Sequence, residues 1–124
     1  MFENEFIRIE RHESEIPWIK IFAVKPYTEL TQCDPETKTW IFRAMEIGER
    51  LMLEYFKPDK INIASFGNYV PHLHVHLMAR FRDDSFFPEP MWGQKQREGS
   101  ISVPDFEPFA QLLAKKLEIA EITG

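Results

Sequence analysis

The stretch from Asn68 to Arg80, NYVPHLHVHLMAR, contains three of the four histidines of the chain. The three stand at every second position, with apolar residues between them. Because successive side chains of a β-strand point to opposite faces of a sheet, this spacing predicts a strand over residues 70–81 with two different faces. The histidine face carries His72, His74 and His76, and the buried face carries Leu73, Val75 and Leu77.

Turn residues and apolar periodicity outside this strand predict the remaining elements. Asp34 and Pro35 are typical of a helix start, and apolar residues recur at three- and four-residue steps from there to about Phe56. In chain order we expect strands at residues 6–9 and 16–24, a helix at 35–56, strands at 60–66 and 70–81, an irregular segment at 83–104, and a helix after Asp105. This order predicts an α+β fold in which two hairpins form a mostly antiparallel sheet, with one long helix packed on it and a C-terminal helix.

Composition limits the class of protein. The 124 residues, 44% of them apolar, are enough for one folded domain, and a net charge of −5 disfavours a broad nucleic-acid-binding surface. A single cysteine, Cys33, permits no internal disulfide, which suits a reducing cytoplasm. The N-terminal residues do not resemble a signal peptide, and no apolar run approaches the roughly 20 residues of a membrane span. We therefore expect a cytoplasmic protein without a membrane partner.

Three alternating imidazoles allow three interpretations. They can be ordinary, half-exposed strand residues. They can bind a metal, because a His-x-His pair presents two nitrogen ligands to zinc, although a straight row diverges and no CxxC pair supports it. They can perform nucleophilic catalysis at phosphorus, because an imidazole with a pKa of about 6.5 is available as a neutral nucleophile at pH 7. A neighbouring imidazole can then stabilise oxygen charge or assist the leaving group.

The sequence HLHVHLM at residues 72–78 resembles the His-φ-His-φ-His-φ-φ motif (φ, apolar) of the histidine triad (HIT) superfamily of nucleotide hydrolases and transferases. The similarity extends to the Asp-Pro helix start, to KINIASFGN before the motif and to ARFRDD and PEPMWG after it, a pattern similar to that of bacterial HIT-like proteins. The resemblance implies a single HIT-like domain over residues 1–124. It also implies cleavage at the α-phosphorus of a small-molecule nucleotide, no required metal or other cofactor, and a homodimer.

The resemblance also implies roles for particular residues. His74 would be the nucleophile, His72 would orient it through its backbone carbonyl, and His76 would contact the phosphate and assist the leaving group. Asn68 would lie near the phosphate, and Asn62 is a second polar candidate, although a solvent-facing strand position explains it equally well.

One segment departs from the family pattern. Many HIT enzymes carry a further histidine after the second strand, whereas residues 24–30 here read VKPYTEL, with Tyr27 or Thr28 nearby. This departure keeps two alternatives open: a nucleotide-binding protein with little or no catalysis, and a metal-dependent enzyme that uses the histidine row.

Other residues are assigned from the pattern alone. Trp92 is expected at the mouth of the pocket, at a dimer contact, or in plain packing, whereas Trp18 and Trp40 are expected in the core. Arg80 and Arg82 would share the histidine face, where they could steer a phosphate or pair with nearby acids such as Asp84.

Overall fold

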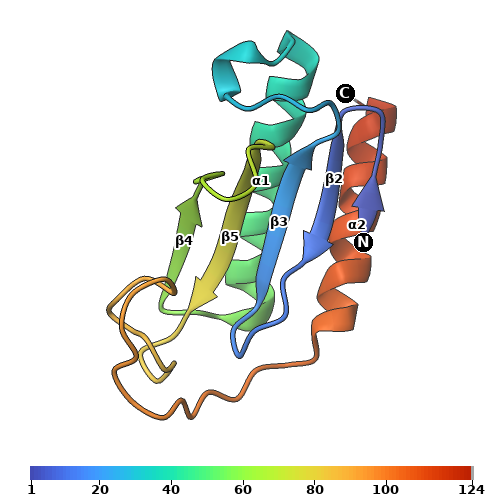
Figure 1. Cartoon of the computed structure of the whole chain (residues 1–124). Coiled ribbons are helices and arrows are strands. Elements are labelled where there is room, and N and C mark those ends of the chain that lie inside the picture. Colours follow the sequence, from blue (N-terminus) through green and yellow to red (C-terminus); the bar gives the residue numbers. More distant parts are fainter. Residues whose placement is uncertain (124) are drawn as a thin grey trace.

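The computed structural model describes residues 1–123, which form a five-stranded antiparallel sheet with two long helices (Figure 1). The strands are β1 (Phe2–Glu3), β2 (Ile7–Arg11), β3 (Trp18–Ala23), β4 (Lys60–Ala64) and β5 (His74–Arg80). The helices are the short 3-10 helix η1 (Leu30–Gln32), α1 (Pro35–Phe56) and α2 (Phe106–Thr123). The predicted α+β fold class is therefore confirmed, and so is the order of its elements.

Strand β5, which contains two of the three motif histidines, lies inside the sheet. The strand order is β1-β2-β3-β5-β4, and every neighbouring pair is antiparallel. His76 is paired with Lys20 of β3 on one side and with Ala64 of β4 on the other. The two predicted hairpins, β2–β3 and β4–β5, are both present. Strand β1 was not predicted, because two residues are too few to show an alternation.

Helix α1 follows the predicted bounds. The side chain of Asp34 accepts a hydrogen bond from the backbone N–H of Thr37, Pro35 occupies the first turn, and the helix ends before Lys57, whose φ of 52° is left-handed. Its buried residues include Ile41, Ala44 and Met52. Packing of these side chains against β3 and β5 covers one face of the sheet.

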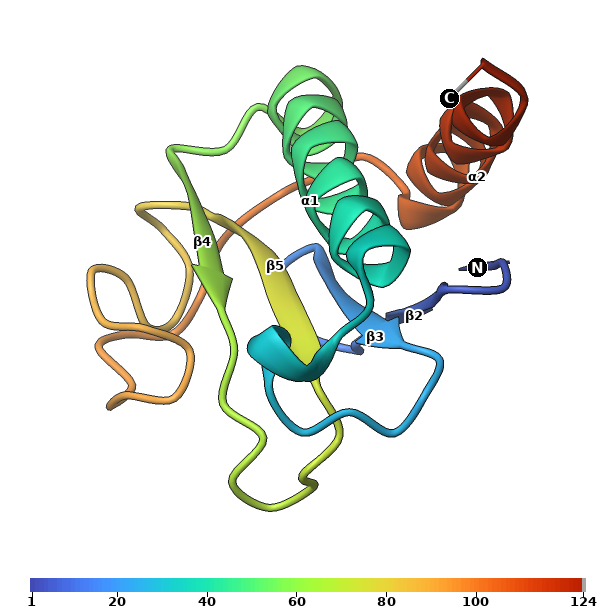
Figure 2. The same cartoon turned by 90° about the horizontal axis from the view of Figure 1, so that it is seen from above.

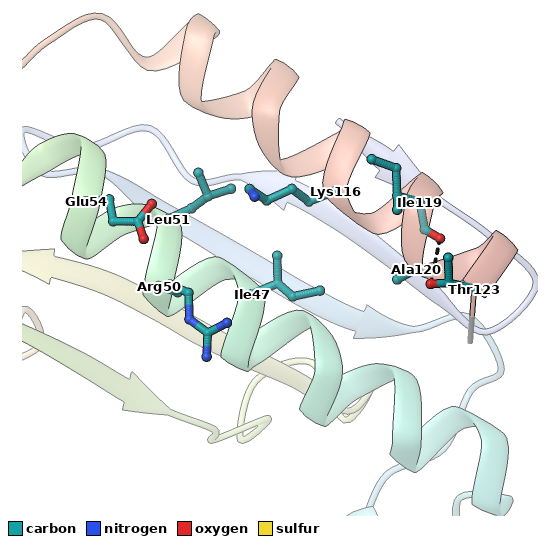
Figure 3. Close-up of a pocket in the computed structure, with 8 residues that line it drawn as sticks. All are labelled: Ile47, Arg50, Leu51, Glu54, Lys116, Ile119, Ala120 and Thr123. Carbon is teal, nitrogen blue, oxygen red and sulfur yellow. Dashed lines mark hydrogen bonds between the residues drawn. The ribbon is translucent and has the colours of Figure 1, made fainter.

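Helix α2 lies beside α1 on the same side of the sheet, as Figure 2 shows. Its buried face carries Phe109, Leu113 and Leu117, as the sequence pattern predicts. The two helices leave a hollow of about 300 Å³ between them, into which Ile47, Leu51 and Lys116 project (Figure 3). Within residues 1–123, no helix has the length and apolarity needed to cross a membrane.

The histidine strand is shorter than predicted. Residues 70–73 precede it, so the strand begins at His74 and His72 lies just outside. Pro71 has no N–H to offer a neighbouring strand, which opposes regular pairing at this end. The predicted alternation of faces is nevertheless correct for the apolar residues, since Leu73, Val75 and Leu77 are all buried in the main core.

The segment between β5 and α2 has no regular element, as predicted, but it is organised around one buried ion pair. The Arg80 guanidinium contacts both carboxylate oxygens of Asp84, at 3.0 and 3.1 Å, and also donates to the carbonyl of Glu89. Asp84 in turn accepts hydrogen bonds from the backbone N–H groups of Phe86 and Phe87. These contacts position the following turn, which carries Trp92.

Candidate active site

The site lies on the face of the sheet opposite the helices. In the register of the sheet, His74 and His76 share this face with Lys20 and Phe22 of β3. Val75 and Leu77, on the other face, contribute to the core under α1. Burial of those two apolar residues therefore determines which way the histidines point.

His74 is held by a contact that determines its tautomer. Its Nδ1 lies 2.7 Å from the backbone carbonyl of His72. A carbonyl oxygen can only accept, so Nδ1 carries the proton and the neutral ring keeps its lone pair at Nε2. Phe22 stacks on this ring, with centroids 4.9 Å apart. The ring is thus fixed in the tautomer that a nucleophile at Nε2 requires.

His76 has the opposite tautomer. The indole N–H of Trp18 donates to Nδ1 of His76 at 3.0 Å, and because an indole nitrogen is only a donor, His76 carries its proton on Nε2. Burial, together with the nearby His74, His12 and Lys20, lowers the pKa of His76 to about 4. His76 is therefore neutral at pH 7 and presents an Nε2–H donor.

The contacts of His72 position the residues around it. Its ring Nε2 donates to the backbone carbonyl of Ala23 at the end of β3, and the ring packs edge-on against Phe22. Two imidazole nitrogens here bond to backbone carbonyls: Nε2 of His72 bonds to Ala23, and Nδ1 of His74 bonds to His72. The segment 70–73 therefore joins the end of β3 to the ring of His74.

A cavity of about 350 Å³ opens beside His74 and His76. The other residues that line it are Phe66, Gly67, Asn68, Tyr69, Val70 and Trp92. Trp92 contacts both His76 and Phe66, with ring centroids 4.8 Å apart in each case. The structure thus brings two of the motif histidines, Asn68 and Trp92 to one cavity. The hollow between α1 and α2 lies on the other side of the sheet and contains no histidine.

Other residues singled out in the sequence lie elsewhere. The side-chain oxygen of Asn62 accepts from Arg80 Nη1 at 2.8 Å, and Asn62 does not line the cavity. Arg80 is paired with Asp84, whereas Arg82 is exposed beside Asp59.

The segment that departs from the family pattern contacts the motif through its backbone, since the carbonyl of Tyr27 accepts a hydrogen bond from the N–H of Leu73, but the side chains of Tyr27 and Thr28 have other partners. The Tyr27 hydroxyl donates to Asp34, the N-cap residue of α1, and the Thr28 hydroxyl donates to Gln32 of η1. Across residues 1–123, no cluster of three or more histidine, cysteine or acidic side chains has the arrangement of a metal site.

Sequence reasoning missed three contributors to the site. Trp18 is buried as predicted, but it also bonds to His76, and only the strand register could reveal that contact. Phe66 and Tyr69 line the cavity from the loop before the motif. Large aromatic residues on both sides of the turn residues Gly67 and Asn68 are the sequence feature that indicates this role.

Comparison with known proteins places this chain among histidine triad proteins. The HIT domain family model matches residues 14–83. No curated protein gave a match. Among solved structures, a histidine triad protein from Bradyrhizobium japonicum is 25% identical, with a TM-score of 0.71 over 91% of this chain and 83% of that one. One from Marinobacter aquaeolei is 26% identical, with a TM-score of 0.69 over 91% and 81%. A zinc-bound histidine triad family protein from Mycobacterium smegmatis, 19% identical, has a TM-score of 0.55 over 99% and 86% and shows the fold alone.

Proposed function

Because the chain belongs to the histidine triad (HIT) family, we propose that it cleaves nucleotides at the α-phosphorus through a covalent nucleotidyl-histidine at His74. The observation that supports this most strongly is the pair of opposed tautomers beside one cavity. His74 has a free lone pair at Nε2, and His76 has a proton at Nε2. A nucleophile and a hydrogen-bond donor therefore stand next to each other, with ring centroids 4.9 Å apart.

The first step uses the lone pair of His74. Nε2 attacks phosphorus, a P–N bond forms, and the bond from phosphorus to the leaving group breaks with its electron pair on the leaving group. The ring keeps its Nδ1 proton and so becomes positively charged, and the carbonyl of His72 stabilises this charge. The leaving group takes its proton from water.

His76 acts in this step as a hydrogen-bond donor. Its Nδ1 faces the N–H of Trp18, and loss of the Nε2 proton would leave an imidazolate in a buried position. It therefore retains its proton and donates it in a hydrogen bond to a phosphoryl oxygen, where negative charge increases in the transition state. In the second step water attacks phosphorus and releases one proton to solvent, the P–N electron pair returns to Nε2 of His74, and the nucleoside monophosphate leaves.

The test is turnover of an adenosine 5′-phosphoramidate by the wild type and by H74A. We expect no measurable turnover by H74A, because the nucleophile is lost while a half-buried surface position tolerates alanine. H74G with added imidazole should regain activity, since free imidazole can occupy the space of the missing ring. A neutral denaturing quench followed by intact-mass measurement should detect adenylated wild type and unmodified H74A.

Three results would change the proposal. Unchanged turnover by H74A would remove His74 from its role. Tight binding of AMP without any product would favour the nucleotide-binding alternative. Stoichiometric zinc in the purified protein, together with turnover that a chelator abolishes, would favour the metal-dependent alternative.

We also propose a homodimer formed through β4. This strand is the last in the sheet order, so its outer backbone edge has no strand partner within residues 1–123, and Ile63 on it is 45% exposed. A second copy related by a two-fold axis would cover this edge. Size-exclusion chromatography with light scattering should give twice the chain mass for the wild type. The same measurement on I63K should give the mass of one chain.

A further inference from the structure

His12, the one histidine outside the motif, lies on the indole of Trp18. It follows β2 in the turn that leads to β3, and its backbone N–H donates to the backbone carbonyl of Trp18 at 2.9 Å. Its imidazole stacks on the indole, with ring centroids 3.9 Å apart and an angle of 30° between the ring planes. The backbone contact thus holds His12 opposite Trp18, and the side chain covers one face of the indole.

The contacts of Trp18 with the site have a different geometry. The indole meets the rings of His76 and Trp92 at interplanar angles of 70° and 72°, so neither ring lies parallel to it. Within residues 1–123, His12 is the only ring that stacks on Trp18. The broad face contact of the indole is therefore the one with His12, whereas its N–H edge points at His76.

The direction of this N–H depends on the plane of the indole, because the N–H bond lies in that plane. A hydrogen bond prefers an angle at hydrogen above about 150° and weakens steeply below about 120°. The 3.0 Å bond from Trp18 to Nδ1 of His76 is therefore sensitive to a tilt of the indole. Without the ring of His12 the indole would have room to tilt, and His76 would lose part of its preference for the Nε2–H tautomer.

The charge state of His12 suits this place. Burial lowers the pKa of His12, and the nearby Lys20 lowers it further, so the imidazole is neutral at pH 7. A neutral ring covers the indole without adding a positive charge close to His76. Phenylalanine, which is flat and always neutral, is therefore the substitute that keeps both properties.

Building on the proposed function, we propose that His12 is a positioning residue: its imidazole holds the indole of Trp18 in the plane that directs the N–H at Nδ1 of His76. His12 does not line the cavity. It acts through Trp18, and the proton on Nε2 of His76 is the feature that it secures. The fourth histidine of the chain thus supports the site from outside the motif.

The test measures kcat and KM for the adenosine 5′-phosphoramidate, and the tautomer of His76 by nitrogen NMR. We expect H12A to lower kcat about threefold to tenfold, in line with the loss of one stacked aromatic pair, and to change KM less than about twofold. Its NMR spectrum should show a mixture of tautomers at His76. H12F, which keeps a flat ring, should retain at least about half of the wild-type kcat. E13A is the matched control, because Glu13 lies in the same turn and its side chain is 88% exposed.

A double variant shows whether His12 acts through Trp18. In W18F the indole N–H is already absent, so the addition of H12A should lower kcat by less than about a further twofold. H12L tests the flat ring itself, because leucine fills much of the same space without a flat face. It should lower kcat as H12A does, and it carries the comparison if H12A does not fold.

The outcomes separate this inference from the proposed function. Wild-type kcat and an unchanged His76 tautomer in H12A or H12L would overturn the inference, and so would equal losses from H12A in the wild-type and W18F backgrounds. His74-dependent turnover would still support the proposed function in these cases. If the wild type gave no turnover, the proposed function would fail, whereas the NMR spectra of H12A and H12F would still test whether His12 holds Trp18 against His76.

Discussion

The indole N–H of Trp18 donates to Nδ1 of His76 at 3.0 Å, across the neighbouring strands β3 and β5. This one contact assigns the remaining proton of His76 to Nε2, and the bulk of Trp18 helps to exclude water from the imidazole. The geometry of a residue outside the motif thus sets the hydrogen-bonding role of a residue within it.

We predict that W18F lowers kcat about tenfold and changes KM little. Phenylalanine cannot donate a hydrogen bond to Nδ1, so His76 no longer favours the Nε2–H tautomer. A tenfold decrease in kcat corresponds to about 1.4 kcal/mol, which is typical of the net contribution of one hydrogen bond. Nitrogen NMR of the imidazole should show a mixture of tautomers at His76. W40F is the matched control, because Trp40 lies in α1; equal effects of both changes would indicate a general loss of packing.

Acidification should destabilise the protein through His76. The pKa of His76 in the folded protein, about 4, lies below the ordinary value of 6.5, so between these pH values the unfolded chain binds a proton that the folded one does not. The stability contributed by neutral His76 is therefore complete above about pH 6.5 and declines toward pH 4, with a slope of at most about 1.4 kcal/mol per pH unit.

Urea unfolding at several pH values between 4 and 7.5 measures how steeply the unfolding free energy depends on pH. In H76Q this dependence should be weaker. Part of the slope should persist in that variant, because burial and Lys20 also lower the pKa of His12. An H76Q curve parallel to that of the wild type would contradict the assignment.

Removal of Arg80 from the buried Arg80–Asp84 pair should be strongly destabilising. The side chains of Arg80 and Asp84 are 2% and 0% exposed, and R80M leaves the carboxylate buried without its partner. We expect a loss of about 3–5 kcal/mol in the free energy of unfolding. R50M, which breaks the exposed pair with Glu46, should cost less than about 1 kcal/mol. Similar losses for the two variants would contradict this account.

Acid should weaken the same pair. Burial opposes ionisation of Asp84, but hydrogen bonds from Arg80 and from three backbone N–H groups outweigh it and hold the pKa of Asp84 below its ordinary value. This stabilisation is present above the unfolded pKa of about 3.9 and is lost as the pH falls through the lower, folded value. D84N should remove this loss at low pH while lowering stability at pH 7.

Gly67 should be sensitive to any side chain. Its φ of +72° lies in the left-handed region, where a Cβ costs about 1–2 kcal/mol. We expect G67A to lower the unfolding free energy by about this amount or to displace the loop and raise KM, since Gly67 lines the cavity. G67N should be milder because asparagine tolerates this conformation. Unfolding curves and KM values for the two variants test the prediction; identical effects would show that backbone strain is not the cause.

Local patterns were sufficient for much of the fold. The bounds of α1 followed from Asp34, Pro35 and the apolar periodicity, because capping and amphipathicity act within a few residues. The alternation of residues 72–77 correctly separated a histidine-bearing face from the apolar face that joins the main core. The start of β5 was misplaced because strand length depends on pairing with a neighbour, and Pro71 interrupts that pairing.

The partners of the site residues were beyond such patterns. Asn62 was a candidate for substrate contact; in the structure it is paired with Met78 across the sheet, and its side-chain oxygen accepts a hydrogen bond from Arg80. Trp92 could have been a pocket, interface or core residue, and the loop anchored on Asp84 brings it to His76. Both outcomes depend on which segments fold against each other.

The sequence by itself determined that this chain has two opposite faces on a histidine-bearing strand, that a long helix covers the apolar one, and that the motif is that of the HIT family. Only the tertiary structure decided the proton positions on His74 and His76, the partner of Asn62 and the aromatic wall of the cavity. The physical reason is range: side-chain alternation and helix capping are set by neighbours along the chain, whereas a tautomer or a cavity is set by groups that folding brings together from distant positions.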